Sequence, residues 1–242
     1  LIGILFLIPF LFFLYKGLLN KQLIKKLLIV FFMGGFQGFL GWYMVKSGLT
    51  DVPHVSHYRL AVHLVIAFLI LAYIYNLKLL LENKDITRNF NYKYYSNFIS
   101  FIIFLLFIQV IYGAFNAGLK TVNTINTFPF FNDLVIPFSK FYSESFWSNL
   151  YENHFGVQLI HRYLGFFITV LILLFVYKSN QKIDRIKIEN QYLIVLILFQ
   201  CMLGVLTIIS NASIVFALLH QFLAILIILF SIKIKHNLNY GK

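Results

Sequence analysis

The sequence has little charge and almost no cysteine, and each shortage excludes a class of protein. Only 12% of its 242 residues are Asp, Glu, Lys or Arg, whereas 60% are hydrophobic. A water-soluble domain carries nearer a quarter charged residues, so that class is excluded. The single cysteine, Cys201, excludes an internal disulfide and a cluster of thiolate metal ligands. The composition therefore predicts an all-α integral membrane protein.

Uncharged apolar runs that can cross, or nearly cross, a bilayer provide the expected helices. A membrane helix needs about 20 apolar residues. Six such runs cover residues 27–45, 60–77, 97–119, 163–177 with an upstream extension to about 157, 192–210 and 211–232. A seventh run, 1–15, starts without an initiating Met or a basic segment, so we expect the tail of a helix that begins upstream and not a signal peptide. The sequence thus predicts about seven helices.

Basic residues between these runs predict the topology. If the seven runs cross in succession, 15 of the 20 lysines and arginines fall on one side of the membrane. They are Lys16, Lys21, Lys25, Lys26, Lys78, Lys84, Arg88, Lys93, Lys178, Lys182, Arg185, Lys187, Lys233, Lys235 and Lys242. By the positive-inside rule that side is the cytoplasm or the mitochondrial matrix. The net charge of +12 then reflects loops that face anionic lipid, and we expect no nucleic-acid partner.

One long segment, residues 120–156, connects two of the expected helices on the opposite, outer side. A connection of this length is functional or disordered in most compact proteins. It is rich in aromatic residues, which favours a folded cap on the membrane surface. Anchoring of single aromatic side chains at the membrane interface is the alternative.

A five-residue motif, Gln-x-x-x-Gly, occurs in three of the expected helices, at Gln37–Gly41, Gln109–Gly113 and Gln200–Gly204. Residues four positions apart share a helix face, where glycine permits close packing and glutamine can form a hydrogen bond to a neighbouring helix. A single copy would indicate plain packing. The recurrence of the motif at corresponding positions indicates an internal repeat.

A histidine follows each motif in the next expected helix: His63, His161 and His220. All three should lie at a similar depth near the outer side. The expected spans contain no Asp or Glu, which disfavours a proton relay. Histidines on facing helices of a dry bundle are the usual axial ligands of haem. We expect His161 and His220 to form a pair, whereas the partner of His63 would lie outside this chain; hydrogen bonds between helices remain the alternative.

Other basic side chains near the three histidines are candidates for a supporting role. Arg59 precedes His63 by one helical turn and Arg162 adjoins His161, so each could bind a haem propionate. Snorkelling of each arginine to the interface is the alternative. Four further histidines, predicted to lie in loops as solvated residues or as supports of the cap, are His54, His57, His154 and His236.

The motif-bearing stretches together resemble haem A synthase in its mitochondrial and alphaproteobacterial form. They include QGFLGWYMVKSGL from Gln37, VSHYRLAVHL from Val55, YGAFNAGL from Tyr112, NTFP from Asn126 and WSNLYEN from Trp147. The last matching stretches are VQLIHR from Val157, LGVLT from Leu203 and His220-Gln221. They run in order through nearly the whole chain, so the resemblance is more specific than any single motif.

The resemblance implies two pseudo-repeated four-helix bundles, an eight-helix plan. The N-terminal half, 1–84, would take haem O as substrate at His63 and Arg59. The C-terminal half, 94–236 with the outer loop 120–156, would hold haem b at His161, His220 and Arg162. All three histidines would be axial ligands of haem iron.

The implied reaction oxidises a methyl group of haem O to a formyl group, giving haem A for cytochrome c oxidase. Implied partners are haem O synthase, oxidase assembly factors, membrane lipid and a second copy of the chain, in a bacterial inner or mitochondrial inner membrane. The catalytic glutamate of the family, and one of its histidines, would lie upstream of Leu1. The chain would then be N-terminally incomplete, and we assign no catalytic residue within it.

Two other functions remain open from the residues alone. A non-enzymatic cytochrome b with two histidine ligands could pass electrons to or from quinone, although such a protein has no reason to carry the NTFP loop at Asn126. A small-molecule transporter with an internal repeat would have broken helices at mid-membrane and no bound haem.

Overall fold

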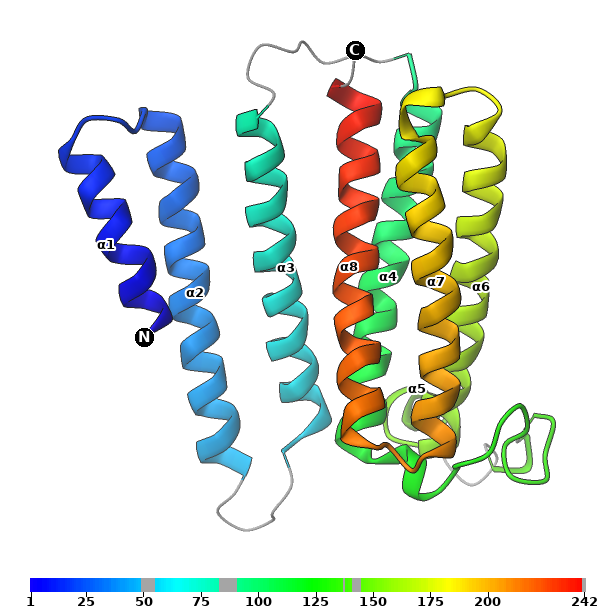
Figure 1. Cartoon of the computed structure of the whole chain (residues 1–242). Helices are drawn as coiled ribbons and strands as arrows, with labels where there is room; N and C mark the ends of the chain where they lie inside the picture. Colours follow the sequence, from blue (N-terminus) through cyan, green and yellow to red (C-terminus); the bar gives the residue numbers. More distant parts are fainter. Residues whose placement is uncertain (49–54, 83–90, 137, 141–144, 241–242) are drawn as a thin grey trace.

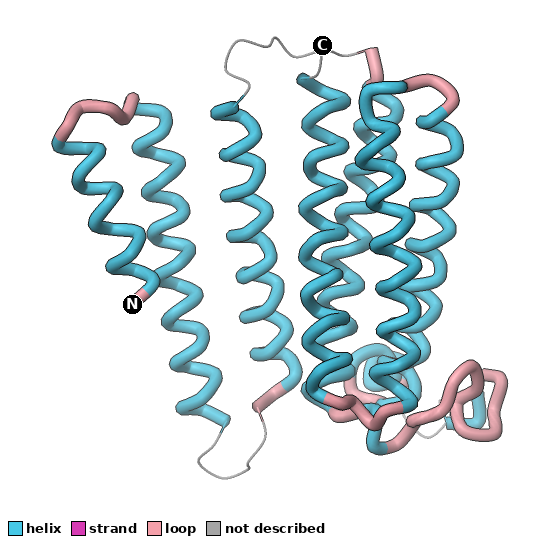
Figure 2. The backbone as a smooth tube through the Cα atoms, viewed as in Figure 1, coloured by secondary structure: helices cyan, strands magenta, loops and turns pink. Residues whose placement is uncertain are grey.

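The structure, a computed structural model, describes residues 1–48, 55–82, 91–136, 138–140 and 145–240. Their α-helices are α1 (Ile2–Tyr15), α2 (Lys21–Gly48), α3 (His57–Glu82), α4 (Lys93–Leu119), α5 (Phe146–Tyr151), α6 (His154–Asn180), α7 (Lys187–Ile209) and α8 (Ile214–Tyr240). Three short 3-10 helices are η1 (Thr121–Asn123), η2 (Phe138–Lys140) and η3 (Asp184–Ile186). All helices except α5 and the 3-10 turns run roughly alongside one another (Figures 1 and 2).

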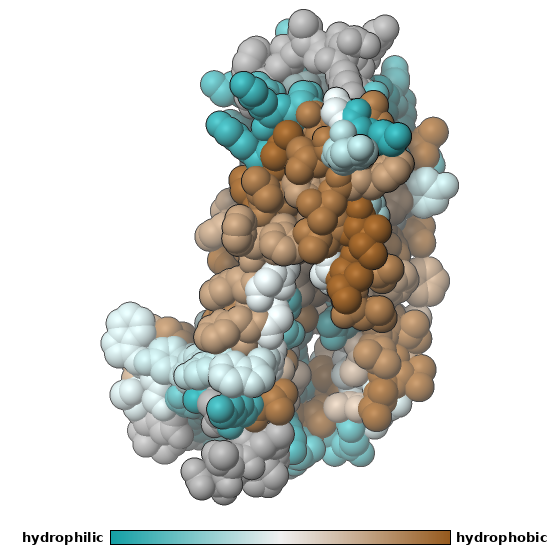
Figure 3. Space-filling model, turned by 90° about the vertical axis from the view of Figure 1, so that its left-hand side faces the viewer, coloured by the Kyte–Doolittle hydropathy of each residue, from teal (hydrophilic) through white to brown (hydrophobic). Residues whose placement is uncertain are grey.

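The chain is an all-α, multi-pass membrane protein, as its composition predicted. Six of its helices, α2, α3, α4, α6, α7 and α8, are long and apolar enough to cross a bilayer, and α1 is a shorter apolar helix. Each predicted run lies almost entirely within one of these helices. The helical structure follows from the lipid environment, because only a helix or a closed barrel provides hydrogen bonds to every backbone group inside the bilayer. Figure 3 views the molecule from the side of α1, and on this face apolar surface covers the middle while hydrophilic residues lie towards the ends.

The described basic residues predicted for one side lie at one end of the bundle, whereas Lys84, Arg88 and Lys242 lie outside the described residues. The last turns of α1, α3, α6 and α8 and the first turns of α2, α4 and α7 are at this end (Figure 1). The last turns of α2, α4 and α7 and the first turns of α3, α6 and α8 are at the other end, which we call the outer end. This arrangement matches the predicted alternation of crossings, and the assignment of the basic end to the cytoplasm or matrix stays a prediction.

A four-helix bundle forms the centre of the molecule. In it α4 packs against α6 and α8, and α7 packs against α6 and α8, while α3 contacts α4 and α8. The remaining helices continue outward as a layer, α2 on α3 and α1 on α2. Fully buried core residues include Ile99, Ile102, Ile168, Ile172, Phe175, Leu193, Ile227 and Ile234. The two halves predicted from the repeat, 1–84 and 94–236, stay a proposal.

The outer segment between α4 and α6 is folded over much of its length. It starts at Lys120, whose left-handed φ of 53° ends α4, and continues through η1 and a bridge between Phe131 and Leu134. The side chain of Ser145 caps α5, and that of Asn153 caps α6 by accepting from the amides of Phe155 and Gly156. We call the described residues 121–136 the outer cap.

Candidate functional site

Each glycine of the repeated motif packs against the imidazole of one histidine. A Cβ atom built on Gly41 would lie 3.2 Å from Cε1 of His63, and one on Gly204 would lie 3.1 Å from Cε1 of His220. The third copy is similar, because a Cβ on Gly113 would lie 3.3 Å from Cε1 of His161. The helices are thus paired as α2 with α3, α4 with α6 and α7 with α8. A methyl group at any of these three positions would require the ring to shift by a few tenths of an ångström, and glycine avoids this.

Each glutamine of the motif contacts the same histidine as its glycine. Nε2 of Gln37 donates to the main-chain oxygen of His63 at 3.0 Å, and Nε2 of Gln109 donates to the main-chain oxygen of His161 at 2.9 Å. Nε2 of Gln200 lies 3.3 Å from Nε2 of His220. The sequence pattern therefore encodes one cluster, built three times from a glutamine, a glycine and a histidine.

The atoms of these clusters that could coordinate a metal ion are almost all imidazole nitrogens. Within the described residues no three or more His, Cys, Asp or Glu side chains gather as they would around a bare metal ion. Nδ1 of His63 and Nδ1 of His161 are buried and have no hydrogen-bond partner. Isolated imidazoles in an apolar bundle suit a metal that brings its own equatorial ligands, as haem iron does. These residues therefore fit haem better than a free cation.

The pair predicted from the sequence, His161 and His220, lies within the central bundle. His161 is on α6 and His220 is on α8, and both helices contact α4. His63 lies on α3 beside the central bundle, together with its own Gln37 and Gly41 on α2.

Arg162 is buried beneath the outer cap, where its guanidinium binds the loop. Its Nη2 donates to the main-chain oxygen of Thr127 at 2.8 Å and to Oε1 of Gln158 at 2.9 Å. Its Nη1 lies 3.2 Å from the main-chain oxygen of Phe130, and the cation lies 4.3 Å from the ring centre of Phe131. Nε is buried without a partner. The cap thus uses most of the donors of Arg162, and contact with a propionate stays a prediction.

Arg59, the other predicted propionate partner, lies on α3 one turn from His63. Its guanidinium carbon is 5.2 Å from the ring centre of Tyr43 on α2, a cation–π contact. Tyr43 follows Gly41 by two residues. Arg59 therefore joins the same two helices as the His63 cluster, and its role towards a ligand is untested.

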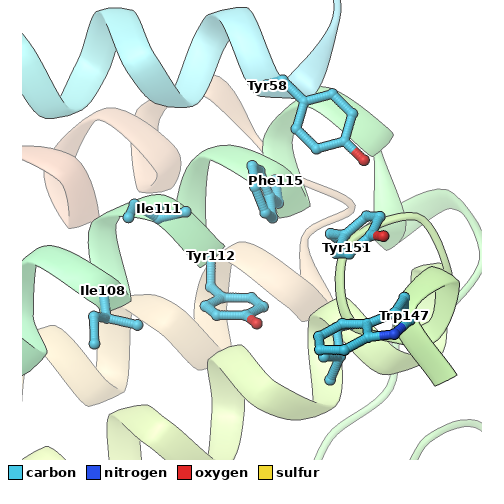
Figure 4. A pocket seen from close by; sticks show the side chains of 8 residues that line it. Tyr58, Ile108, Ile111, Tyr112, Phe115, Trp147 and Tyr151 are labelled. Atoms are coloured by element: carbon cyan, nitrogen blue, oxygen red, sulfur yellow. The ribbon is translucent and has the colours of Figure 1, made fainter.

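A groove with a volume of about 270 Å³ lies at the outer end between α3, α4 and α5. Aromatic rings dominate its lining, among them Tyr58, Tyr112, Phe115, Trp147 and Tyr151 (Figure 4). The hydroxyl of Tyr58 donates to Glu152, whose other carboxylate oxygen lies 3.6 Å from Nε2 of His57. These contacts connect the start of α3 to the segment around α5.

The remaining histidines have varied positions. His57 and His154 were predicted to lie in loops, and this was wrong, because they are the first residues of α3 and α6. Both contact the outer segment, as one of the two predictions required: Nε2 of the buried His57 lies 3.6 Å from Glu152, and Nδ1 of His154 lies 2.8 Å from Oγ1 of Thr124. His236 was predicted to lie in a loop, and this was wrong: it is buried within α8, near Tyr240. The reason is that α8 continues to Tyr240, past the last uncharged run and through Lys233 and Lys235. His54 lies outside the described residues.

Comparison with known proteins identifies relatives over most of the chain. The chain is 38% identical over 236 residues to "Heme A synthase" of Ehrlichia ruminantium (strain Gardel), covering 97% of this chain and 66% of that protein. It is 35% identical to "Heme A synthase" of Wolbachia pipientis wMel over 90% of this chain and 61% of that protein. For "Heme A synthase" of Flavobacterium psychrophilum the identity is 34%, over 94% of this chain and 68% of that protein.

The chain thus spans 66%, 61% and 68% of the length of these three relatives, less than two thirds for the first two. A family model described as "Cytochrome oxidase assembly protein", COX15-CtaA, matches residues 1–232. That match includes all three glutamine–glycine–histidine clusters and the outer cap. The chain therefore belongs to the COX15-CtaA family of cytochrome oxidase assembly proteins.

Proposed function

We propose that the protein takes part in haem A synthesis, the oxidation of a methyl group of haem O to a formyl group for cytochrome c oxidase. The support is the family membership, the names of the relatives and one structural observation. That observation is the pair of imidazoles, His161 and His220, each backed by a glycine and a glutamine inside an apolar four-helix bundle.

The proposed overall reaction converts R–CH3 and water to R–CHO with release of four protons and four electrons. A haem b between His161 and His220 would supply reversible one-electron chemistry. The two histidines would hold it by their ring nitrogens. Gly113 and Gly204 leave room for the rings, and the apolar helices around them exclude water from the pair.

The substrate side is proposed at His63 and Arg59. His63 would contribute a ring nitrogen to the iron of haem O, and Arg59 would bind an anionic propionate. Gln37 and Gly41 hold His63 from α2, as the other two motifs hold their histidines. No residue of the described chain is assigned the role of abstracting or delivering a proton in the oxidation.

The setting follows from the reaction. We propose that the protein receives haem O from haem O synthase and delivers haem A to oxidase assembly factors. It would do so in a bacterial inner or mitochondrial inner membrane, in contact with lipid and with further copies of itself.

A reduced-minus-oxidised absorption spectrum of the purified full-length protein tests haem binding at the proposed pair. We expect a b-type band that is lost in His161→Ala and in His220→Ala and kept in His63→Ala, because only the first two residues form the pair in the central bundle. Loss of the band in His63→Ala alone would contradict the assignment. Absence of any band in the unaltered protein would contradict both haem functions.

The enzymatic step needs a separate measurement. Incubation of the protein with haem O, followed by mass analysis of the extracted haems, should give a product with a formyl group. A b-type band without this product would instead favour the cytochrome that exchanges electrons with quinone.

A further inference from the structure

The glutamines of the repeated motif bind their histidines in three different ways. The amide nitrogen of Gln109 contacts only the main-chain oxygen of His161, at 2.9 Å. The amide nitrogen of Gln37 contacts both the main-chain oxygen of His63, at 3.0 Å, and its Nε2, at 3.2 Å. The contact of Gln200 with His220 is to Nε2, at 3.3 Å. The same amide therefore has two acceptors within reach, the ring nitrogen and the main-chain oxygen.

The protonation of the rings follows from these contacts. Nδ1 of His220 lies 3.1 Å from the main-chain oxygen of Gln200. A carbonyl oxygen can only accept, so Nδ1 carries the proton, and the lone pair of the neutral ring is on Nε2. In the other cluster, Nε2 of Gln37 contacts both the main-chain oxygen and Nε2 of His63. The main-chain oxygen can only accept, so the amide nitrogen is the donor in both contacts and Nε2 of His63 is an acceptor. In both clusters the glutamine donates to the nitrogen that is free to bind a metal.

The lone pair on Nε2 can accept a hydrogen bond from the amide or coordinate a metal ion, and it cannot do both at once. We propose that each glutamine is a positioning residue that alternates between the two acceptors of its histidine. Bonded to Nε2, it fixes the tautomer and the orientation of the ring. Bonded to the main-chain oxygen, it frees Nε2 for iron while still connecting the two helices. The Gln109 cluster shows the second arrangement, and the Gln37 cluster shows that one amide can reach both acceptors.

The surroundings of the glutamines favour such a movement. Oε1 of Gln37, Gln109 and Gln200 is buried without a hydrogen-bond partner in each cluster. No bond from the oxygen therefore opposes rotation of the amide. The backbone of α6 also lies close to the amide of Gln109, since a Cβ on Gly165 would lie 3.1 Å from Nε2 of Gln109. Gly165 thus leaves space on α6 for the amide in its main-chain-bonded position.

This inference rests on the proposed haem binding, but its first test needs no haem. We would record the ¹⁵N resonances of histidine side chains in the haem-free, full-length protein. Gln200→Met keeps the length of the side chain and removes the donor, so Nε2 of His220 should shift towards the position of a nitrogen without a hydrogen bond. Nδ1 of His220 should stay in place, because its acceptor belongs to the main chain. Gln109→Met should leave Nε2 of His161 unchanged.

The second test measures the rate at which haem b is taken up. Removing one neutral hydrogen bond to Nε2 should speed binding in Gln200→Met by about 2- to 12-fold. Gln221→Met is the matched control: Gln221 adjoins His220 and is exposed, so neither the rate nor the resonances should change.

The proposal is overturned if Nε2 of His220 does not move in Gln200→Met. It is also overturned if Gln200→Met abolishes haem binding as His220→Ala should, because the glutamine would then be indispensable to the site. Failure of the haem proposal has a different signature. The unaltered protein would then bind no haem, while the resonance of His220 could still respond to Gln200→Met.

Discussion

At the scale of single residues, the histidine clusters show what spacing in a sequence can predict. Positions i and i+4 place Gln200 and Gly204 on one helix face, for which the sequence predicted close packing and a hydrogen bond to a neighbouring helix. Both features are present in the structure. The choice of acceptor by each amide could not be predicted, because the two acceptors can be almost equally close: the amide nitrogen of Gln37 lies 3.2 Å from the ring nitrogen and 3.0 Å from the main-chain oxygen of His63.

A glycine-to-alanine change tests the close contact at the ring. In Gly204→Ala the new methyl group would lie 3.1 Å from Cε1 and 3.6 Å from Nδ1 of His220, so the ring must shift. We expect a loss of about 1–3 kcal/mol in the free energy of unfolding, the usual cost of overpacking. Thermal unfolding in detergent, followed by circular dichroism, measures it.

The matched control is Gly38→Ala on α2, because a Cβ at Gly38 meets nothing within 4 Å. There the higher helix propensity of alanine should leave stability unchanged or raise it by up to about 1 kcal/mol. Equal destabilisation in both variants would show that the contact with the ring is unimportant.

At the scale of elements, the outer cap was expected as a folded segment, but its attachment was not. Arg162 adjoins a candidate ligand, and its charge suited a propionate as well as an interface. In the structure it binds main-chain oxygens 32 and 35 residues earlier in the chain. A sequence reveals a charged hydrogen-bond donor such as arginine, but it does not reveal which main-chain oxygens that donor will bind. The ion pair of Glu189 with Lys233, at 3.1 Å near the basic end, was missed for a related reason, since only the fold brings α7 and α8 together there.

Replacement of Arg162 tests its hold on the cap. Lysine keeps the charge but cannot form the fork that reaches Thr127 and Phe130 together. With one or more charge-assisted hydrogen bonds lost, at about 1.5–3 kcal/mol each, amides of residues 121–136 in Arg162→Lys should exchange at least about 10-fold faster. Hydrogen–deuterium exchange with mass spectrometry measures this.

The comparison variant is Arg59→Lys, whose contact with Tyr43 is on another pair of helices and is one that lysine can also make. Exchange in residues 121–136 should be unaffected by it. If Arg162→Lys also leaves this exchange unaffected, the arginine does not stabilise the cap.

At the scale of the whole molecule, composition was the strongest predictor. The apolar runs yielded every helix long enough to span a membrane, because lipid leaves the backbone few alternatives. The ends were less predictable: α2 and α8 continue into basic sequence, where hydropathy no longer marks the helix. Helix α5 was also missed, since its six residues are too few for a periodic pattern.

Cysteine labelling tests the predicted sidedness of the membrane protein. In a Cys201→Ala background, Trp147→Cys on α5 should react with a maleimide that cannot cross membranes when it is added to intact cells. Lys21→Cys at the start of α2 should react only after permeabilisation, because it belongs to the basic end. Both positions are exposed, so burial does not confound the result. Labelling of Lys21→Cys in intact cells would show that the topology is the opposite of the one predicted.

The attachments of the outer cap impose an order on the biogenesis of the protein. The cap is bonded to α6 through Arg162 and Gln158, and to the turn between α7 and α8 through Asn126 and Asn211, whose side chains are 3.0 Å apart. It therefore links α6, which carries His161, to the turn that precedes α8, which carries His220. With the predicted topology, the cap has to cross the membrane, and the turn before α8 has to be synthesised, before both attachments exist. Any ligand that needs the two histidines at their final separation can therefore bind only after translocation of the cap and synthesis of the last helix.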